Sequence, residues 1–220
     1  MTPDISIRAQ LYRQAIILAQ ITVFYNFAEG MISILLGLED ETLSLFGFGL
    51  DSFVEVISGI GIWHMVLRQR QNPDSSRDRF ERRALQVTGS AFYFLTAILV
   101  VTSVVNLIQN HHPETTFWGA VVALVSILTM WLLIHYKMQV GGELGSEAII
   151  ADAKCTRACL QLSVVLLISS IGYELTGIGG IDALGSLLIA GLAFREGREA
   201  FAKSSGDARC SCADKGCSDS

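Results

Sequence analysis

Six apolar stretches, each about as long as a membrane-spanning helix, constrain this chain more than any other feature of its sequence. About 20 apolar residues are needed to cross roughly 30 Å of hydrocarbon at 1.5 Å per residue. Such windows can be placed at residues 15–38, 43–67, 85–108, 117–136, 148–175 and 180–194, of which the last is the shortest. Because 51% of the residues are apolar and the charged residues are clustered, we expect an all-α, polytopic membrane protein with its six transmembrane helices in one bundle.

The basic residues indicate which side of the membrane the termini occupy. The first stretch is too long for a signal-peptide core, and an even number of spans puts both termini on one side. The connections on the opposite side, 39–42, 109–116 and 176–179, contain no Lys or Arg. The positive-inside rule therefore predicts cytoplasmic termini. All Lys and Arg residues fall on the side of the termini. They are Arg8, Arg13, Arg68, Arg70, Arg77, Arg79, Arg82, Arg83, Lys137, Lys154, Arg157, Arg195, Arg198, Lys203, Arg209 and Lys215.

Short connections divide the chain into one membrane domain and a tail. Neighbouring spans joined by a few residues pack as antiparallel helices, and the Gly-rich segment 140–148 predicts a flexible turn between spans four and five. We therefore interpret residues 1–203 as a six-helix transmembrane domain. Residues 204–220 are too few to build a core, since chains below about 40 residues rarely fold alone, and we expect a disordered, Cys-containing cytoplasmic tail.

Two carboxylates, Asp51 and Glu55, lie in the middle of the second apolar stretch. A spacing of four residues places them on one helix face, one turn apart. They lie roughly 12 to 18 Å along the span at 1.5 Å per residue, near mid-membrane. An isolated charge there costs about 2.5 to 3.5 kcal/mol, and two acids side by side repel each other. The pair therefore predicts a bound cation.

The fifth apolar stretch carries a second row of candidate ligands. Asp152, Cys155 and Cys159 recur along one helical stripe, and Cys159 reaches about the depth of Glu55. Together with the two acids of the second stretch, Cys155 and Cys159 would complete a tetrahedral Zn²⁺ site. Thiolates favour Zn²⁺, Cd²⁺ or other soft divalent transition metals over Mg²⁺ and Ca²⁺. Asp152, nearer the cytoplasm, is a fifth ligand or a gate; the alternative for the cysteines is packing as small apolar residues.

Three further features have weaker interpretations. Glu29, with Asn26 on its face, lies about as deep as Asp51 and is a ligand, a proton carrier or a structural partner. Asp182 is better explained as the cap of the sixth span than as a ligand. The tail cysteines form a weak soft-metal site, because they lack the paired C-x-x-C spacing of structural zinc sites. A reducing cytoplasm disfavours disulfides among them. They are Cys210, Cys212 and Cys217.

Two segments carry a resemblance to a known family. GFGLDSFVEVISG, which contains Asp51 and Glu55, resembles the D-x-x-x-D segment of the cation diffusion facilitators. SEAIIADAKCTRAC is similar to the same family's A-D-x-x-H-x-x-x-D segment, with Cys155 and Cys159 where His and Asp usually stand. YNFAEG and FREGREA look like a compact bacterial branch, related to a vertebrate zinc-binding transmembrane protein of synaptic vesicles. The likeness spans the six-helix region.

The resemblance implies a homodimeric antiporter that exports Zn²⁺ or a similar ion in exchange for H⁺. It also implies that the protein lies in the plasma (inner) membrane of a bacterium. The His and Asp replacements leave the usual metal preference open. The family's folded cytoplasmic domain is not recognisable in this sequence, so we expect the transmembrane helices to form most of the dimer contact.

A metal-binding sensor or scaffold and a membrane-embedded enzyme are the alternatives to a transporter. A non-transporting membrane sensor or scaffold would bind metal stoichiometrically without flux. A membrane-embedded enzyme would use the acid pair for metal-assisted chemistry, but the sequence has no nucleophile motif, HExxH or phosphate-binding glycine loop. We therefore expect no enzymatic activity and no nucleic-acid partner.

Overall fold

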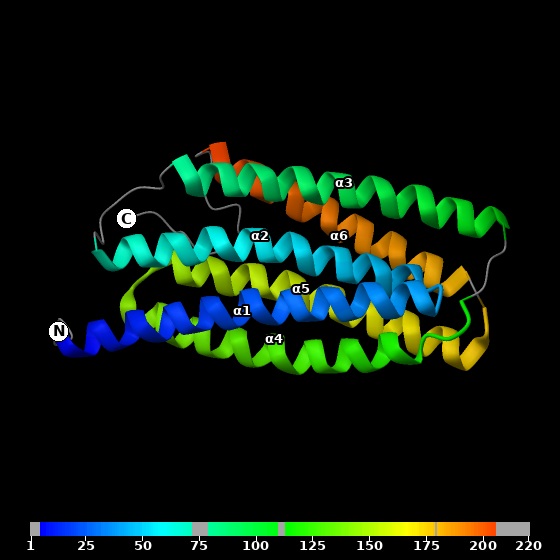
Figure 1. Ribbon diagram of the computed structural model, residues 1–220, viewed down its shortest axis with the longest axis horizontal. Coiled ribbons are helices and arrows are strands. Elements are labelled where there is room, and N and C mark those ends of the chain that lie inside the picture. The colour runs from blue at the N-terminus through cyan, green and yellow to red at the C-terminus, as the bar shows by residue number, and fades with distance from the viewer. Residues whose placement is uncertain (1–4, 72–78, 110–112, 179, 206–220) are drawn as a thin grey trace, which may run out of the picture.

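The computed structural model describes residues 5–71, 79–109, 113–178 and 180–205, and these residues form six α-helices and no β-strand. The helices run back and forth along one elongated bundle (Figure 1). The start of α1 and the end of α6 lie at the same end of the bundle, on the left in Figure 1, and this end is here called the near end. The α1–α2 connection lies at the opposite end, on the right, which is called the far end. The all-α helical bundle predicted from the sequence is confirmed. The helices are α1 (Ile5–Glu39), α2 (Leu43–Gln71), α3 (Arg79–Gln109), α4 (Phe117–Leu144), α5 (Glu147–Thr176) and α6 (Gly180–Ser205).

Several helices extend beyond the apolar stretches that predicted them, among them α4. This helix continues past residue 136 to Leu144 and ends at Gly145, whose φ of 61° is left-handed. Glycine adopts that conformation without the Cβ clash that other residues meet. The sequence placed Lys137 in the connection between spans four and five. That placement is wrong, because Lys137 lies within α4 and its side chain is fully buried.

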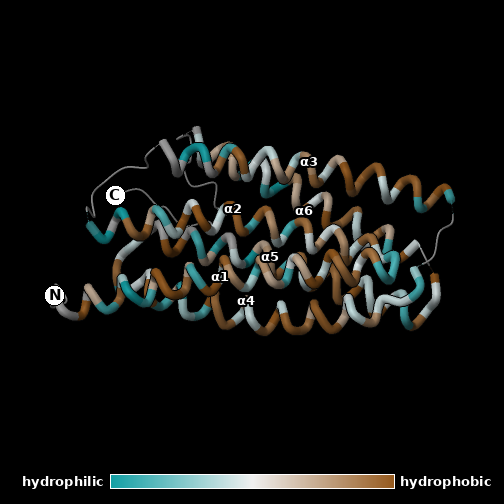
Figure 2. Tube along the Cα trace, in the orientation of Figure 1, coloured by the Kyte–Doolittle hydropathy of each residue, from teal (hydrophilic) through white to brown (hydrophobic). Residues whose placement is uncertain are grey.

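The outer surface of the bundle is suited to lipid. Within the part of the chain that the structure describes, five helices, α1 to α5, contain a stretch long and apolar enough to span a membrane. The second half of α6 carries five charged residues, Arg195, Glu196, Arg198, Glu199 and Lys203. Large apolar side chains such as Phe94, Leu128, Trp131, Ile168 and Leu188 point outward. Hydrophobic residues run along the helices in Figure 2, as an integral membrane protein requires.

The two helices that carry the candidate ligands, α2 and α5, are in contact inside the bundle. In Figure 1, α3 and α6 form one side of the bundle, α1 and α4 form the other, and α2 and α5 lie between them. α2 packs against α1, α3, α5 and α6, and α5 packs against α2, α4 and α6. The main core between these helices therefore also fixes the distance between the two rows of ligands. Its fully buried members include Leu45, Leu99, Leu162, Leu166 and Ile189.

Two glycines bring α3 and α6 close together. A Cβ added at Gly89 of α3 would lie 2.7 Å from the Phe201 side chain, and one at Gly197 of α6 would lie 3.3 Å from the carbonyl oxygen of Gly89. Only glycines allow the backbones this approach without displacing a neighbour. The residues next to them in sequence, Thr88 and Glu196, are thereby held at the same level of the bundle.

At the far end, acidic side chains from one helix cap the start of another. Asp182 of α6 accepts hydrogen bonds from the backbone N–H groups of Leu43 and Ser44, at 2.8 and 3.2 Å, and from the Ser44 hydroxyl. Glu174 of α5 accepts one from the backbone N–H of Thr116 at 2.6 Å, just before α4. Helix starts carry unsatisfied N–H donors and a partial positive charge. Asp182, which the sequence assigned to its own helix, caps α2 instead.

Candidate metal centre

The contact between Glu55 and Cys159 joins α2 to α5. The Cys159 thiol donates a hydrogen bond to Glu55 Oε1, and Asn26 Nδ2 of α1 donates one to Glu55 Oε2 at 3.0 Å. Cys159 is buried and Glu55 is half-buried. A soft donor and a hard donor thus meet at one level of the bundle. This is the level at which the sequence predicted that the two rows of ligands would lie.

Asp51 lies one helical turn before Glu55 and is buried almost completely. Its exposed fraction is 1%, and its Oδ1 atom has no hydrogen-bond partner among the described residues. An unpaired polar group removed from water costs about 1 to 3 kcal/mol, and more when it is charged. Asp51 is therefore a buried acid that its described surroundings leave partly uncompensated.

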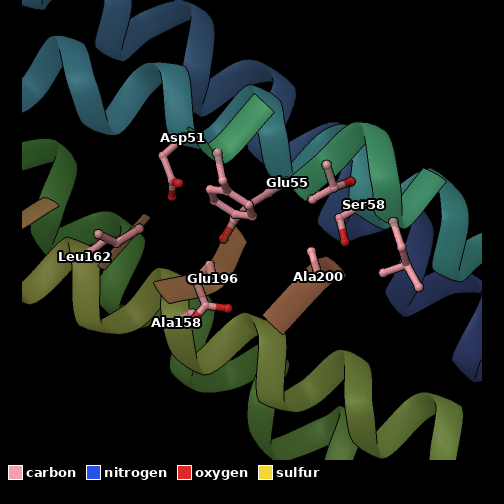
Figure 3. A pocket seen from close by; sticks show the side chains of 10 residues that line it. Asp51, Glu55, Ser58, Ala158, Leu162, Glu196 and Ala200 are labelled. Carbon is pink, nitrogen blue, oxygen red and sulfur yellow. The ribbon is translucent and has the colours of Figure 1, made fainter. Parts of the chain in front are cut away.

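A cavity of about 40 Å³ begins at these two acids. It continues between α2, α3, α5 and α6 towards the near end, and Figure 3 shows the side chains around it. One acid in its wall, Glu196, was assigned no role by the sequence analysis. The sequence holds a partial signal, because Glu196 follows closely on the last apolar stretch and lies four residues before Ala200, on the same helix face. The lining residues are Asp51, Glu55, Ser58, Leu85, Thr88, Phe92, Ala158, Leu162, Glu196 and Ala200.

Asp152, the entrance residue of the sequence analysis, is engaged by a basic partner. Lys137 Nζ of α4 lies 3.0 Å from Asp152 Oδ2 and donates a 2.9 Å hydrogen bond to Thr156 Oγ1. Both members of the ion pair are buried, and Asp152 does not line the cavity. The arrangement satisfies the charge of Asp152 without a metal.

Glu29 of α1 is held by hydroxyl groups. Its Oε1 accepts a 2.9 Å hydrogen bond from the Tyr25 hydroxyl, and its Oε2 accepts one of 3.2 Å from Ser52. Ser52 adjoins Asp51 in sequence, so Glu29 lies beside the acid pair but outside the cavity wall. Of the three roles left open for Glu29, this geometry fits the structural partner or proton carrier better than the direct ligand.

The remaining predicted ligands fall partly outside the described residues. Cys155 lies on α5, but its side chain is not among those described, and neither are the tail cysteines Cys210, Cys212 and Cys217. Among the side chains that are described, no group of three or more His, Cys, Asp or Glu residues surrounds a common point as metal ligands would. For Asp51, Glu55 and Cys159 to bind one ion, their side chains would have to move closer together.

Comparisons with known proteins agree with a polytopic membrane protein. A protein-family model described as "cation efflux transmembrane domain" matches residues 15–207. An uncharacterised transporter of Methanocaldococcus jannaschii is 29% identical over 77% of this chain and 61% of its own length. The magnetosome protein MamB of Paramagnetospirillum magneticum is 26% identical over 74% and 56%, and that of Magnetospirillum gryphiswaldense 25% over 77% and 58%. The chain thus spans roughly three-fifths of these relatives' length.

Proposed function

This chain belongs to the cation efflux family, and we propose that it carries a divalent metal cation across the membrane, held by Asp51, Glu55 and Cys159. One observation supports the proposal above the others. The Cys159 thiol meets the Glu55 carboxylate at mid-bundle, beside an Asp51 oxygen that is buried without a partner. Acids inside a membrane protein mark ion pathways by default. A cation at this point would offset the cost of burying both carboxylates.

The donor atoms favour Zn²⁺, with Cd²⁺ and other soft divalent ions next. Carboxylate oxygens and a thiolate sulfur together suit a tetrahedral Zn²⁺, whereas Mg²⁺ and Ca²⁺ prefer oxygen donors alone. Cys155, one turn before Cys159 on α5, is the proposed fourth ligand. The ion is the cargo of the protein, so its affinity has to be moderate enough for release.

The thiol proton suggests how transport is coupled to H⁺. The proton that Cys159 shares with Glu55 has to leave before the sulfur can bind a metal, because thiolate rather than thiol is the ligand. Metal entry and proton loss are therefore linked at one bond. Protons that return from the opposite side would displace the metal from the sulfur and release the ion. Metal and protons would then cross the membrane in opposite directions, as in an antiporter.

The position of the cavity supports export. The cavity runs from Asp51 towards the near end, where Leu85 lies close to the start of α3 and Ala200 close to the end of α6. The basic residues gather at this end, so we propose that it is the cytoplasmic end, as the positive-inside rule predicts. We propose that the ion enters there, in the plasma membrane of a bacterium, and that two copies of the chain pair through their transmembrane helices.

The ion pair between Lys137 and Asp152 favours a gate over a fifth ligand. It ties α4 to α5 on the near side of Cys159, and Lys137 would have to be displaced before Asp152 could bind a metal. Movement of α5 during transport would stretch or release this pair. Asp152 then controls access to the site without holding the cargo.

Flux through proteoliposomes tests the proposal. We expect Zn²⁺ uptake that is driven by a pH gradient and lost in Asp51→Asn, while Glu143→Gln, which changes an exposed acid of α4, transports normally. Zn²⁺ bound without flux in the unmodified protein would favour the sensor or scaffold. Flux undiminished in Asp51→Asn would remove the proposed site.

A further inference from the structure

The cavity wall contains a carboxylate from a helix outside the proposed site. Glu196 and Ala200 lie one turn apart on α6 and both line the cavity, opposite Asp51 and Glu55 of α2 (Figure 3). Three carboxylates from two helices therefore surround one small space. Converging negative charge with low-dielectric walls raises the local concentration of cations.

Polar atoms in the same wall point to a missing ligand. Thr88 of α3 lines the cavity, is 2% exposed, and its Oγ1 has no hydrogen-bond partner among the described residues. The Oδ1 atom of Asp51, on the other side, has none either. Buried polar atoms in native proteins are nearly always paired. Two such atoms, in residues that line one cavity from two helices, point to a polar ligand between them.

The space is large enough for an ion. A cavity needs about 10 to 15 Å³ to hold one water molecule, and this one measures about 40 Å³. It can therefore accept a divalent cation that keeps part of its hydration shell. The close packing of Gly89 against Gly197 holds Thr88 and Glu196 at one level, so the α3–α6 side of the cavity is built before the ion arrives.

We propose that Asp51, Glu196 and Thr88 form an oxygen-lined loading position for the divalent cation, from which it passes to the thiol-containing site at Glu55 and Cys159. The inference rests on the proposed function and adds a place where the cargo stops first. Asp51 belongs to both positions, so the ion exchanges the oxygens of Glu196 and Thr88 for sulfur without leaving Asp51. Oxygen donors discriminate little between divalent ions, whereas the thiol selects the softer ones.

Zn²⁺ binding to the purified full chain tests the role of Glu196. Isothermal titration calorimetry should show affinity reduced about tenfold in Glu196→Gln, within the range of roughly 10 to 100-fold seen when a supporting metal contact is lost. The matched control is Glu199→Gln, which alters an acid of the same helix that does not line the cavity and pairs with Arg195 at 3.4 Å. We expect its affinity to stay within about twofold of the unmodified protein, because exposed ion pairs contribute little.

A gain of signal provides an independent test that does not depend on a loss of binding. In a background in which Cys210, Cys212 and Cys217 are serine, Glu196→Cys places a thiol in the cavity wall. Bound Cd²⁺ should then show more sulfur-to-cadmium charge-transfer absorption per ion than the background protein. Glu199→Cys should add none.

The outcomes separate the two claims. If Asp51→Asn and Cys159→Ser weaken Zn²⁺ binding while Glu196→Gln binds normally and Glu196→Cys adds no absorption, the loading position is wrong and the proposed function stands. If Asp51→Asn and Cys159→Ser both bind Zn²⁺ as the unmodified protein does, the proposed site itself is wrong. Thermal unfolding of each variant checks that it is folded.

Discussion

Buried acids at the far end and at the middle of the bundle have opposite surroundings. Asp182 lies against the start of α2, where two backbone N–H groups and the Ser44 hydroxyl donate to its carboxylate. Asp51 is buried to the same degree, at 1% exposed, yet one of its oxygens has no partner among the described residues. Asp182 and Asp51 share a residue type and a degree of burial, and differ in what the protein supplies to them.

This difference separates acids that hold the fold from acids that await a ligand. A carboxylate that accepts several hydrogen bonds at a helix start offsets its own desolvation. A carboxylate without such donors has to be compensated from outside, by a cation or a proton. Asp152 belongs with the first group, because Lys137 supplies its countercharge.

The largest expected effect comes from breaking that internal countercharge. Lys137→Met leaves Asp152 buried without its partner, which typically costs about 3 to 5 kcal/mol of folding free energy. The double variant Lys137→Met with Asp152→Leu should recover most of the loss, since a buried pair is often replaceable by apolar residues. Unfolding of the unmodified protein, Lys137→Met, Asp152→Leu and the double variant in detergent, followed by circular dichroism, measures the full double-mutant cycle. A double variant as unstable as the single one would contradict this assignment.

Asp51→Asn should weaken Zn²⁺ binding without destabilising the fold. We expect Zn²⁺ affinity to fall roughly a hundredfold, equivalent to about 2.7 kcal/mol, because a charged ligand is removed. The free energy of unfolding without metal should stay the same or rise, since the amide is less costly to bury than the carboxylate. Calorimetric titration and unfolding of the same preparations measure both quantities. A stability loss as large as the loss in binding would place Asp51 with the structural acids.

Asp182→Ala should show the opposite pattern at the far end. The loss of the α2 cap should lower the free energy of unfolding by about 2 kcal/mol, while Zn²⁺ affinity stays unchanged. Glu174→Ala, at a cap that is more exposed, should cost about half as much. Paired unfolding and titration experiments check both variants. A drop in Zn²⁺ affinity for Asp182→Ala would contradict the separation of acids that hold the fold from acids that bind the ion.

Asp40 provides a smaller test, through the pH dependence of the protein's stability. It lies in the connection after α1, where burial, followed by the neighbouring Glu39, Glu114 and Glu174, raises the pKa of its carboxyl. A pKa higher in the folded than in the unfolded protein means that stability is lost as the pH rises above the ordinary value of the group, about 3.9. Asp40→Asn should therefore be more stable at neutral pH and change less between pH 4 and pH 7. Thermal unfolding at several pH values measures this, and identical pH profiles would contradict it.

The sequence predicted the helices and the meeting of Glu55 with Cys159 because those features depend on local patterns. Apolar length determines which segments span the membrane, and spacing along a helix determines which side chains share a face. Glu55 and Cys159 were matched by depth alone, and the structure brings them into contact.

The residues that the sequence analysis missed depend on contacts between distant segments. The spacing of Glu196 from Ala200 is visible in the sequence, but the direction in which α6 turns Glu196 is not, because that orientation depends on the contact of Gly89 with Gly197. Lys137 was placed in a loop because basic residues usually flank spans, and only the packing of α4 on α5 shows its buried partner. Asp182 was paired with its own helix for the same reason: the start of α2 is distant in sequence.

X-ray absorption at the zinc edge would test most directly whether α2 and α5 hold one ion together. The protein should carry one equivalent of Zn²⁺ in the background where Cys210, Cys212 and Cys217 are serine. We predict a mixed first shell, with oxygen at about 2.0 to 2.2 Å and sulfur at about 2.3 Å, and fewer sulfur neighbours in Cys159→Ser. A shell of oxygen and nitrogen alone, or a sulfur shell unchanged by Cys159→Ser, would contradict the account.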